Sequence, residues 1–262
     1  MKNFKMLALL ISILTSLQSF AEIKEARSMH EVAGYITPGA LVIFDLDNTV
    51  LEAVQTLGTD QFFTFLVKKA EAQGLQGHFA KQKALELATP IQPVSRVRLV
   101  EGITKNFIRE LQTRNYTVMA LTARPASWTE GTLKQVTSLG IDFTRTAPPL
   151  SSGRFAGTPS GQYAGGVLFL PAGLEKGPTL LQFLHDRNLH PTQIIFVDDK
   201  LTNVQSVDAS LTEARIPAIA IRYGAADLRV KNFDKDLAAF EYDYFLNTGV
   251  FLSDDDAYRM LK

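Results

Sequence analysis

Cysteine is absent from the 262-residue sequence, and this absence excludes several chemistries at once. The chain can form no disulfide framework, carries no lipid on a cysteine, and offers neither a thiolate nucleophile nor a zinc site built on thiolates. Stability must therefore come from a hydrophobic core. With 46% hydrophobic and 21% charged residues, a chain of this length is typical of one globular domain with a small insert.

An excess of either charge is also lacking, because 27 basic residues balance 27 acidic ones. Residues 1–21 contain two of the basic residues, Lys2 and Lys5, and no acidic one, so the remaining chain carries a net charge of −2. This balance favours neither nucleic acid nor an anionic membrane as a partner. No later stretch is apolar enough to cross a membrane, so we expect no span in the mature chain.

The N-terminus, MKNFKMLALLISILTSLQSFAEI, has the pattern of a secretory signal peptide. A basic start precedes an apolar run from Met6 to Leu17, and the small residues Ser19 and Ala21 frame a cleavage site after Ala21. A buried helix or a membrane anchor is the alternative, but the run is shorter than the roughly 20 residues that span a bilayer. We expect residues 1–21 to be removed and the mature protein to be periplasmic or secreted.

Short apolar runs alternate with helical patterns along the rest of the chain. This alternation predicts a doubly wound α/β fold, with a parallel sheet that helices cover on both faces. The predicted strands are Leu41–Phe44, Tyr116–Leu121, Ile194–Val197 and Ile216–Ile221, and the predicted helices are Asp60–Gln73, Gly102–Thr113, Ser127–Leu139, Pro178–Asn188 and Thr202–Ser210.

Polar residues follow three of these strands directly, as DLDNT from Asp45, TAR from Thr122 and DD from Asp198. Ligands of such sheets bind beyond the carboxyl ends of the strands, so we expect the three segments to meet at one site. Asp45 at the strand end and Asp47 two residues later would face one substrate. Two carboxylates so close resist joint ionisation, so one of them can stay protonated for acid catalysis.

This pair suits a nucleophile, Asp45, and a general acid and base, Asp47, provided that a cation offsets the negative charge. Oxygen ligands alone favour Mg²⁺, and Asp198 and Asp199 can complete its ligands together with Asp45. Lys176 in EKGPTL and the hydroxyl of Thr122 are then candidates to hold the oxygens of a transferred phosphoryl group.

The order of DLDNT, LTAR, EKGPTL and IIFVDDK resembles the four motifs of the haloacid dehalogenase superfamily, over residues 41–223. Most members are Mg²⁺-dependent phosphohydrolases, and secreted acid phosphatases are the nearest comparison. The resemblance implies that Asp45 forms a phosphoaspartate and that Asp47 protonates the leaving group and then activates water. It implies that Thr122 and Lys176 bind the phosphoryl oxygens. It places Mg²⁺ on Asp45, the backbone carbonyl of Asp47 and one acid of the pair Asp198 and Asp199, with Asp198 favoured.

Residues 52–100 are long enough for a small helical cap inserted after the first strand, within a catalytic domain of residues 22–262. Helical patterns at Asp60–Gln73 and Phe79–Ala88 predict its two helices. Its phenylalanines, Phe62, Phe63 and Phe65, are expected to form the cap core rather than a stacking platform for substrate. Arg96 and Arg98, where the cap rejoins the core, either steer an anionic substrate or are surface residues at a hinge.

Other residues have two readings each. Arg124 can reach a substrate phosphate or carboxylate, or serve as a structural arginine. Asn203 can hydrogen-bond a metal ligand or cap a helix. Thr49 is expected to brace the turn through its hydroxyl or its backbone, and Asp254–Asp256 to begin a helix. YAGGVLFLPAG predicts a hairpin or strand, APPLSSGRFAGTPSGQ a loop, and His185 and His190 are expected at the surface.

The sequence thus predicts an exported Mg²⁺-dependent phosphatase that hydrolyses phosphate monoesters through an aspartyl-phosphate. Its partner would be a small phosphorylated substrate, with a phosphoprotein as an alternative. A secreted binding protein of the same fold with little activity, and a phosphotransferase that uses the same site, are the alternative functions.

Overall fold

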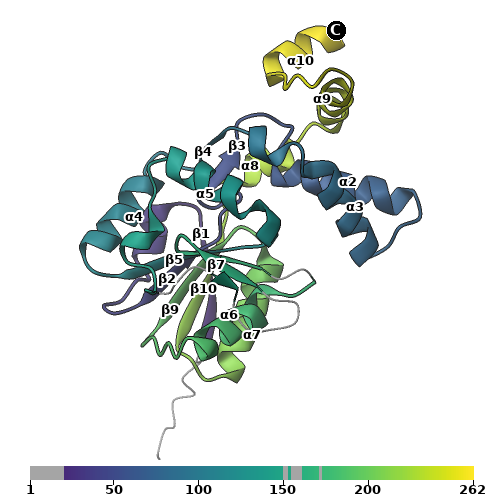
Figure 1. The fold of residues 1–262 in the computed structure, drawn as a ribbon. Coiled ribbons are helices and arrows are strands. Elements are labelled where there is room, and N and C mark those ends of the chain that lie inside the picture. The colour runs from purple at the N-terminus through teal and green to yellow at the C-terminus, as the bar shows by residue number, and fades with distance from the viewer. Residues whose placement is uncertain (1–20, 150–152, 155–160, 171–172) are drawn as a thin grey trace, which may run out of the picture.

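The computed structural model describes residues 21–149, 153–154, 161–170 and 173–262, so residues 1–20 of the predicted signal peptide lie outside the described residues (Figure 1). Its centre is an eight-stranded sheet in the order β1-β10-β9-β2-β5-β8-β7-β6. The first six strands in this order run parallel, and β7 and β6 extend the sheet antiparallel. The predicted α/β class with a mostly parallel sheet is confirmed.

The strand bounds are, in sheet order, β1 Ala21–Ala26, β10 Ala218–Tyr223, β9 Ile194–Asp198, β2 Leu41–Phe44, β5 Thr117–Thr122, β8 Val167–Phe169, β7 Gln162–Ala164 and β6 Gly153–Arg154. The four predicted strands are all present, each within two residues of its expected start and end. β1 is a strand that the sequence pattern did not predict, because its sequence AEIKEA contains no apolar run. Among the described strands β1 lies at the edge of the sheet and has β10 as its one neighbour, so little of it is buried.

Helices cover both faces of the sheet, as the alternating pattern requires. α1 Met29–Ala33, α4 Thr104–Thr113 and α5 Thr129–Ser138 pack on one face, in a core that includes Phe44 and Val197. α6 Lys176–Asp186 and α7 Leu201–Glu213 pack on the other face. Successive residues of β2 alternate between the two cores, because neighbouring side chains of a strand point to opposite faces.

The hairpin expected in YAGGVLFLPAG is formed by β7 and β8. Gly165 and Gly166 connect the strands with φ angles of 59° and 76°, which glycine adopts without strain. The segment predicted as a loop before it is a loop only in part. Gly153–Arg154 pairs with β7 as strand β6, and Gln162 already belongs to β7, whereas residues 150–152 and 155–160 lie outside the described residues.

The predicted cap segment follows the second strand, β2, rather than the first. It contains the antiparallel strands β3 Leu51–Ala53 and β4 Val97–Leu99, the helices α2 Asp60–Ala72 and α3 His78–Ala88, and the short 3₁₀ helix η1 Gln92–Val94. Two further 3₁₀ helices, η2 Ala126–Trp128 and η3 Phe143–Arg145, flank α5. Arg96 and Arg98 are both exposed, and Arg98 on β4 pairs with Glu52 on β3 at 2.8 Å.

The core of the cap segment is shared with the C-terminus, which the sequence analysis did not assign to it. α8 Asp227–Lys231, α9 Lys235–Thr248 and α10 Asp254–Leu261 follow the last strand, and α10 begins at the acidic run as expected. Phe62 is buried against Tyr242 of α9, and Phe63 and Phe65 pack around it. The phenylalanines therefore do form a core, but one that includes α9.

Two acidic residues of the C-terminal helices hold the loop that leads into α2. Asp254 accepts hydrogen bonds from the backbone N–H and the hydroxyl of Thr56 at 2.9 and 2.8 Å. Glu241, which is 1% exposed, accepts from the N–H of Leu57 at 2.9 Å. Burial, together with the negative charge of Asp254, raises the pKa of Glu241 to about 8, although the Leu57 N–H opposes the shift.

Glu241 makes stability depend on pH. In the folded protein the carboxyl group of Glu241 stays protonated up to about pH 8, whereas in the unfolded chain it loses its proton near pH 4.5. The free energy of unfolding therefore falls as the pH rises between these values. Glu241→Gln, which keeps the oxygen that faces Leu57, should be more stable than the wild type by about 1–3 kcal/mol at pH 8.5 and match it at about pH 4. Denaturant unfolding across this pH range measures the difference.

Glu213→Gln, at an exposed position at the end of α7, is the control and should leave the pH dependence unchanged. A Glu241→Gln protein whose stability follows that of the wild type at every pH would contradict the assignment.

Candidate active site

The carboxyl ends of three adjacent strands form the candidate site. β2 lies between β9 and β5 in the sheet, and Phe44 is in register with Val197 on one side and Ala120 on the other. The N–H of Asp45 continues the ladder by donating to the carbonyl of Val197 at 2.8 Å. The sheet therefore brings Asp45 and Asp198 side by side, and Thr122 ends the neighbouring strand.

Lys176 lies between two of these acids. It is the first residue of α6, and its side chain is 1% exposed. Its ammonium group donates to Asp45 Oδ1 at 2.5 Å and to Asp198 Oδ2 at 2.6 Å. Burial alone would lower the pKa of Lys176, but the charges of Asp198 and Asp45 outweigh it and raise the pKa, so the lysine stays protonated. An ammonium has three N–H donors, so one remains for a further acceptor.

Three carboxylates at this end of the sheet are arranged as a cation would require. One oxygen each from Asp45, Asp198 and Asp199 lies within 4.8 Å of the others. Asp199 Oδ1 is buried and has no hydrogen-bond partner among the described residues, although its other oxygen accepts from Asn48 at 3.2 Å. An orphan carboxylate oxygen beside two further acids fits a hard divalent cation such as Mg²⁺.

The pKa shifts of these acids agree with a site built for positive charge. Burial, followed by the charge of Asp198, raises the pKa of Asp45 well above its usual range, even though Lys176 opposes the rise. Burial and the charge of Asp198 also raise the pKa of Asp199, to about 7. Because a cation would stabilise both carboxylates, its binding is expected to release protons at neutral pH.

Asp47 does not join this cluster with its side chain. Arg124 grips it with two parallel hydrogen bonds, from Nε to Oδ2 at 2.8 Å and from Nη2 to Oδ1 at 2.7 Å. Burial would raise the pKa of Asp47, but the charge and hydrogen bonds of Arg124 outweigh it, and the pKa is lowered. The pKa directions of Asp45 and Asp47 are thus the reverse of those that a nucleophile and a general acid need, respectively.

Arg124 is itself buried, and its guanidinium group donates to Asp47 and to two residues of α5. Its Nη1 donates to Gln135 Oε1 at 2.6 Å and to the hydroxyl of Thr132 at 3.2 Å, both on α5. Its backbone N–H donates to the hydroxyl oxygen of Thr122 at 3.2 Å. The hydroxyl hydrogen of Thr122 remains available as a donor.

Other contacts join the cap segment to this site, and the sequence analysis did not single out most of them. Asn48, in the left-handed conformation with φ of 58°, accepts from Gln61 of α2 at 3.2 Å and donates to Asp199. Lys200 pairs with Asp60 of α2 at 2.9 Å. One local signal for these contacts was present in the sequence, namely an asparagine in the turn that follows strand β2. The contacts themselves could not be predicted, because the paired residues lie far apart in the sequence.

The structure shows the contacts of Asn203 and Thr49, for each of which the sequence left two roles open. Asn203 donates to both oxygens of Asp198 at 3.1 Å, so it supports a candidate metal ligand. Lys200, not Asn203, occupies the N-cap position of α7, without a hydrogen bond from its side chain to the helix. Thr49 braces the turn through its backbone, whose N–H donates to the carbonyl of Leu46 at 3.3 Å. Its hydroxyl oxygen is buried and has no partner among the described residues.

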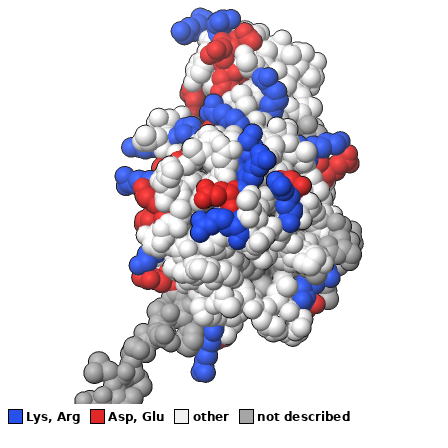
Figure 2. All heavy atoms as spheres, turned by 90° about the vertical axis from the view of Figure 1, so that its left-hand side faces the viewer, with Lys and Arg blue, Asp and Glu red and all other residues white. Residues whose placement is uncertain are grey.

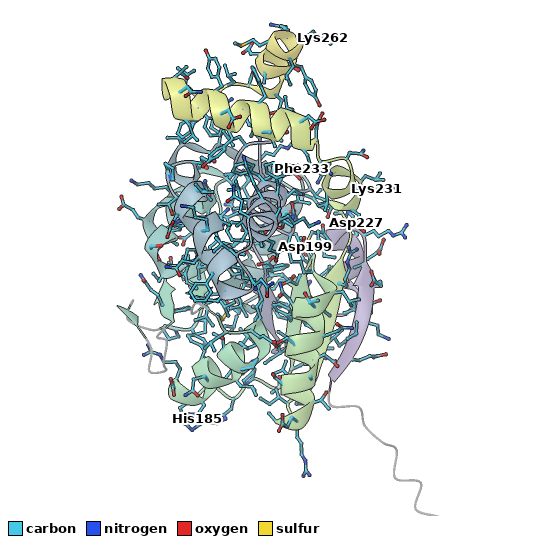
Figure 3. All side chains as sticks on the ribbon, turned by 90° about the vertical axis from the view of Figure 1, so that its right-hand side faces the viewer. His185, Asp199, Asp227, Lys231, Phe233 and Lys262 are labelled. Carbon is cyan, nitrogen blue, oxygen red and sulfur yellow. The ribbon has the colours of Figure 1, made fainter. Side chains whose placement is uncertain are left out.

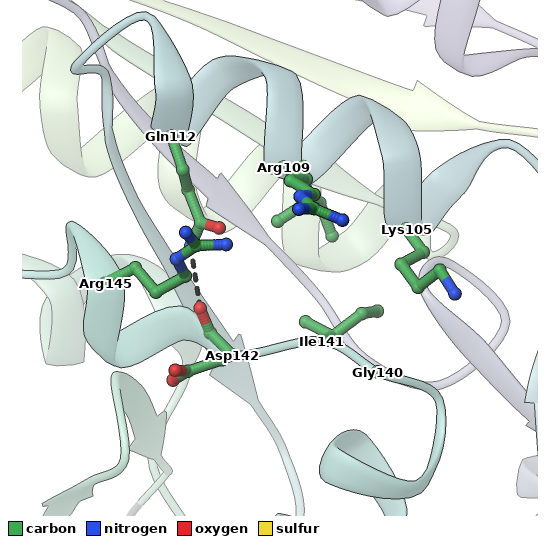
Figure 4. A pocket seen from close by; sticks show the side chains of 8 residues that line it. Lys105, Arg109, Gln112, Gly140, Ile141, Asp142 and Arg145 are labelled. Atoms are coloured by element: carbon green, nitrogen blue, oxygen red, sulfur yellow. Dashed lines mark hydrogen bonds between the residues drawn. The ribbon is translucent and has the colours of Figure 1, made fainter.

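Other polar clusters lie away from these acids. Figure 3 shows Asp199 at the upper end of the sheet, toward Phe233 and α9, and His185 at the opposite end. A hollow of about 70 Å³ between α4 and η3 is lined by residues that include Lys105, Arg109 and Arg145, none of them a predicted site residue (Figure 4). The face of the molecule on the left of Figure 1 mixes basic and acidic side chains (Figure 2).

A family model described as "Protein of unknown function (DUF2608)" matches residues 25–258. The chain belongs to the DUF2608 family. A "Putative outer membrane protein" of Chlamydia pneumoniae is 28% identical over 227 residues, which are 84% of each chain. A protein of the same name from Chlamydia trachomatis is 26% identical and covers 91% of this chain and 90% of its own.

Among solved structures, a hydrolase of the haloacid dehalogenase-like family from Streptococcus pneumoniae has a TM-score of 0.43 and 14% identity. The match covers 74% of this DUF2608 chain and 98% of that one. Within the described part of the chain, no helix has the length and apolar character needed to cross a membrane.

The cluster of three acids predicts that Mg²⁺ stabilises this DUF2608 protein. A ligand that binds only the folded state at about 100 times its dissociation constant adds about 2.7 kcal/mol to the free energy of unfolding. Asp199→Asn, which leaves the contacts of Lys176 in place, should lose most of this gain. Thermal unfolding and calorimetric titration with Mg²⁺ measure it.

The matched control is Asp255→Asn, an exposed acid of α10, which should respond to Mg²⁺ as the wild type does. Equal Mg²⁺ affinity of Asp199→Asn and the wild type would show that Asp199 is not a ligand.

Proposed function

We propose that this protein is an exported, Mg²⁺-dependent phosphatase that hydrolyses phosphate monoesters through an aspartyl-phosphate on Asp45. The observation that carries the proposal is the position of Lys176, whose buried ammonium joins Asp45 to Asp198 inside the acidic cluster. A nucleophilic carboxylate, a fixed cation beside it and a cluster of cation ligands are the parts that phosphoryl transfer requires. They come from the four motifs that resemble the haloacid dehalogenase superfamily.

In the first half of the reaction, an oxygen of Asp45 attacks phosphorus, and the bond from phosphorus to the leaving oxygen breaks. The free N–H of Lys176 and the hydroxyl of Thr122 would donate to the phosphoryl oxygens, where negative charge must be held. The residues that fit Mg²⁺ are Asp45, Asp198 and Asp199, with the backbone carbonyl of Asp47 as the further ligand that the resemblance implies. The ion, when bound, supplies positive charge that offsets the phosphoryl and carboxylate oxygens.

In the second half, water attacks the phosphoaspartate, the bond between phosphorus and the Asp45 oxygen breaks, and phosphate leaves. Asp47 would accept the proton of the attacking water, and its pairing with Arg124 suits this role because it keeps the carboxylate ionised. The same pairing opposes the first half, in which Asp47 would donate a proton to the leaving group. Proton donation therefore requires that Arg124 loosen its hold on Asp47.

Export is proposed on two grounds. Residues 1–21 have the signal-peptide pattern, and two relatives from Chlamydia carry the name "Putative outer membrane protein". A periplasmic or secreted enzyme of this kind would act on a small phosphorylated compound, or alternatively on a phosphoprotein.

A second candidate function is a binding protein of the same fold with little turnover. The bidentate grip of Arg124 on Asp47 favours it, because a general acid held as a carboxylate cannot protonate a leaving group. Transfer of the phosphoryl group from Asp45 to an acceptor other than water is a variant of the main proposal that uses the same residues.

The nucleophile is tested with Asp45→Asn. Phosphate release from p-nitrophenyl phosphate and a panel of small phosphomonoesters should require Mg²⁺, stop with chelator, and fall by at least about 1,000-fold in the variant. Unchanged thermal unfolding of the variant serves as the control for folding. Undiminished turnover by Asp45→Asn would sink the mechanism, and absence of release by the wild type from every compound would favour the binding protein.

The grip on Asp47 predicts a strong dependence on the leaving group. p-Nitrophenyl phosphate needs no proton on its leaving oxygen, whereas an alkyl phosphate does, so kcat/KM, which reports the step that expels the leaving group, should be about 100-fold or more higher for the former. In Asp47→Asn, alkyl phosphates should lose more activity than p-nitrophenyl phosphate. Equal kcat/KM values for both classes in the wild type would mean that Arg124 does not restrain the acid.

A further inference from the structure

A chain of hydrogen-bonded polar groups, all buried except the partly exposed Asp47, runs from Asp47 to the segment through which the cap returns to the sheet. Arg124 holds Asp47, Gln135 holds Arg124, and Gln135 Nε2 donates to the backbone carbonyls of Gln92 at 3.2 Å and Ser95 at 3.0 Å. Gln92 and Ser95 lie at η1, shortly before β4, and η1 contacts α5. We call residues 92–95 the return segment.

Gln135 is the residue of this hydrogen-bonded series that contacts both Arg124 and the return segment. Its amide oxygen accepts from Arg124, at 2.6 Å, and from the side chain of Gln92, at 3.3 Å. Among the described residues, its amide nitrogen donates to carbonyls of the return segment. The side chain is 8% exposed, so losing either set of bonds would leave buried polar atoms unpaired.

The return segment approaches the neighbouring elements closely at two glycines. A Cβ on Gly131 of α5 would lie 2.5 Å from Gln92 Oε1, and a Cβ on Gly58 would collide with Ser95 Oγ. Gly58 precedes α2, so the beginning and the end of the cap meet at this point. The absence of side chains here lets the return segment sit against α5, where Gln135 can reach its carbonyls.

We propose that Gln135 is a positioning residue that ties Arg124, and through it Asp47, to the return segment of the cap. The orientation of Asp47 is then complete only while residues 92–95 are docked on α5. The inference rests on the proposed function, because it assigns a role to Asp47 in that reaction. Gln135 touches neither the substrate nor the reacting atoms and would act through Arg124 alone.

Two substitutions separate the two sets of bonds. Gln135→Met introduces a side chain of similar length and removes the hydrogen bonds to Arg124 and those to the return segment. Gln135→Glu keeps an oxygen for Arg124 but replaces the donor with an oxygen that faces the carbonyls of Gln92 and Ser95. Gln112→Met is the matched control, because Gln112 is also a buried glutamine whose amide donates to a backbone carbonyl, that of Asp142 at 2.8 Å, but it lies on α4 away from the site.

Gln135→Met should lower kcat roughly tenfold with little change in KM, because a small displacement of a catalytic group costs turnover more than binding. Gln135→Glu should also lower kcat, although it keeps its bond to Arg124, and amide hydrogen exchange of residues 92–97 should quicken in both variants. Gln112→Met should change neither. If Gln135→Glu has the kcat of the wild type although amide exchange of residues 92–97 is faster, docking of the return segment does not control Asp47 and the proposal is wrong.

A double-mutant cycle tests whether Gln135 acts through Arg124. In an Arg124→Met background, adding Gln135→Met should lower kcat by less than about twofold, because the group it positions is gone. A full tenfold loss in that background would overturn the proposal and assign Gln135 a structural role only. If Gln135→Met does not fold, the same cycle is run with Gln135→Glu.

The outcome also separates this inference from the proposed function. If the wild type turns over and the cycle is additive, the positioning role fails while the phosphatase stands. If the wild type hydrolyses no phosphomonoester, the proposed function fails, and hydrogen exchange then decides whether Gln135 holds the return segment. Unchanged exchange of residues 92–97 in Gln135→Met would overturn that part as well.

Discussion

A buried lysine between two buried aspartates is the contact on which the candidate site depends. Asp45, Asp198 and Asp199 would repel one another at the end of the sheet, and burial adds to the cost of their ionisation. Lys176 offsets part of this charge by donating to two of them at once. The lysine comes from the start of α6, so the crossover that leads from β8 to β9 places the positive charge among acids that two other segments supply.

The cluster is unbalanced without a further cation. One buried oxygen of Asp199 has no partner among the described residues, and the pKa values of Asp45 and Asp199 are both raised. Asn203 and the N–H of Lys200 already hold Asp198 in place, so its orientation does not depend on an ion. The site is thus organised in advance, and a hard cation would remove its remaining electrostatic cost.

Arg124 offsets the charge of Asp47, as Lys176 does for Asp45 and Asp198. The paired hydrogen bonds orient the carboxylate and also keep it ionised, which favours one half of the proposed reaction and opposes the other. Since Arg124 is held by Gln135, and Gln135 by the return segment, the state of Asp47 is linked to the packing of the cap. The cap in turn shares its core with α9, so the C-terminus takes part in the same assembly.

The sequence by itself determined the α/β class, the four central strands and the order in which the polar motifs follow them. These depend on local signals, namely apolar runs that a buried strand requires and acids placed directly after them. The tertiary structure decided what those acids contact. The grip of Arg124 on Asp47, the ties from Asn48 and Lys200 to α2, and the packing of α9 on Phe62 join residues remote in the sequence. Edge strand β1 was not predicted for a related reason. An exposed strand needs no apolar run, and the position of β1 is set by its pairing with β10, which is remote in the sequence.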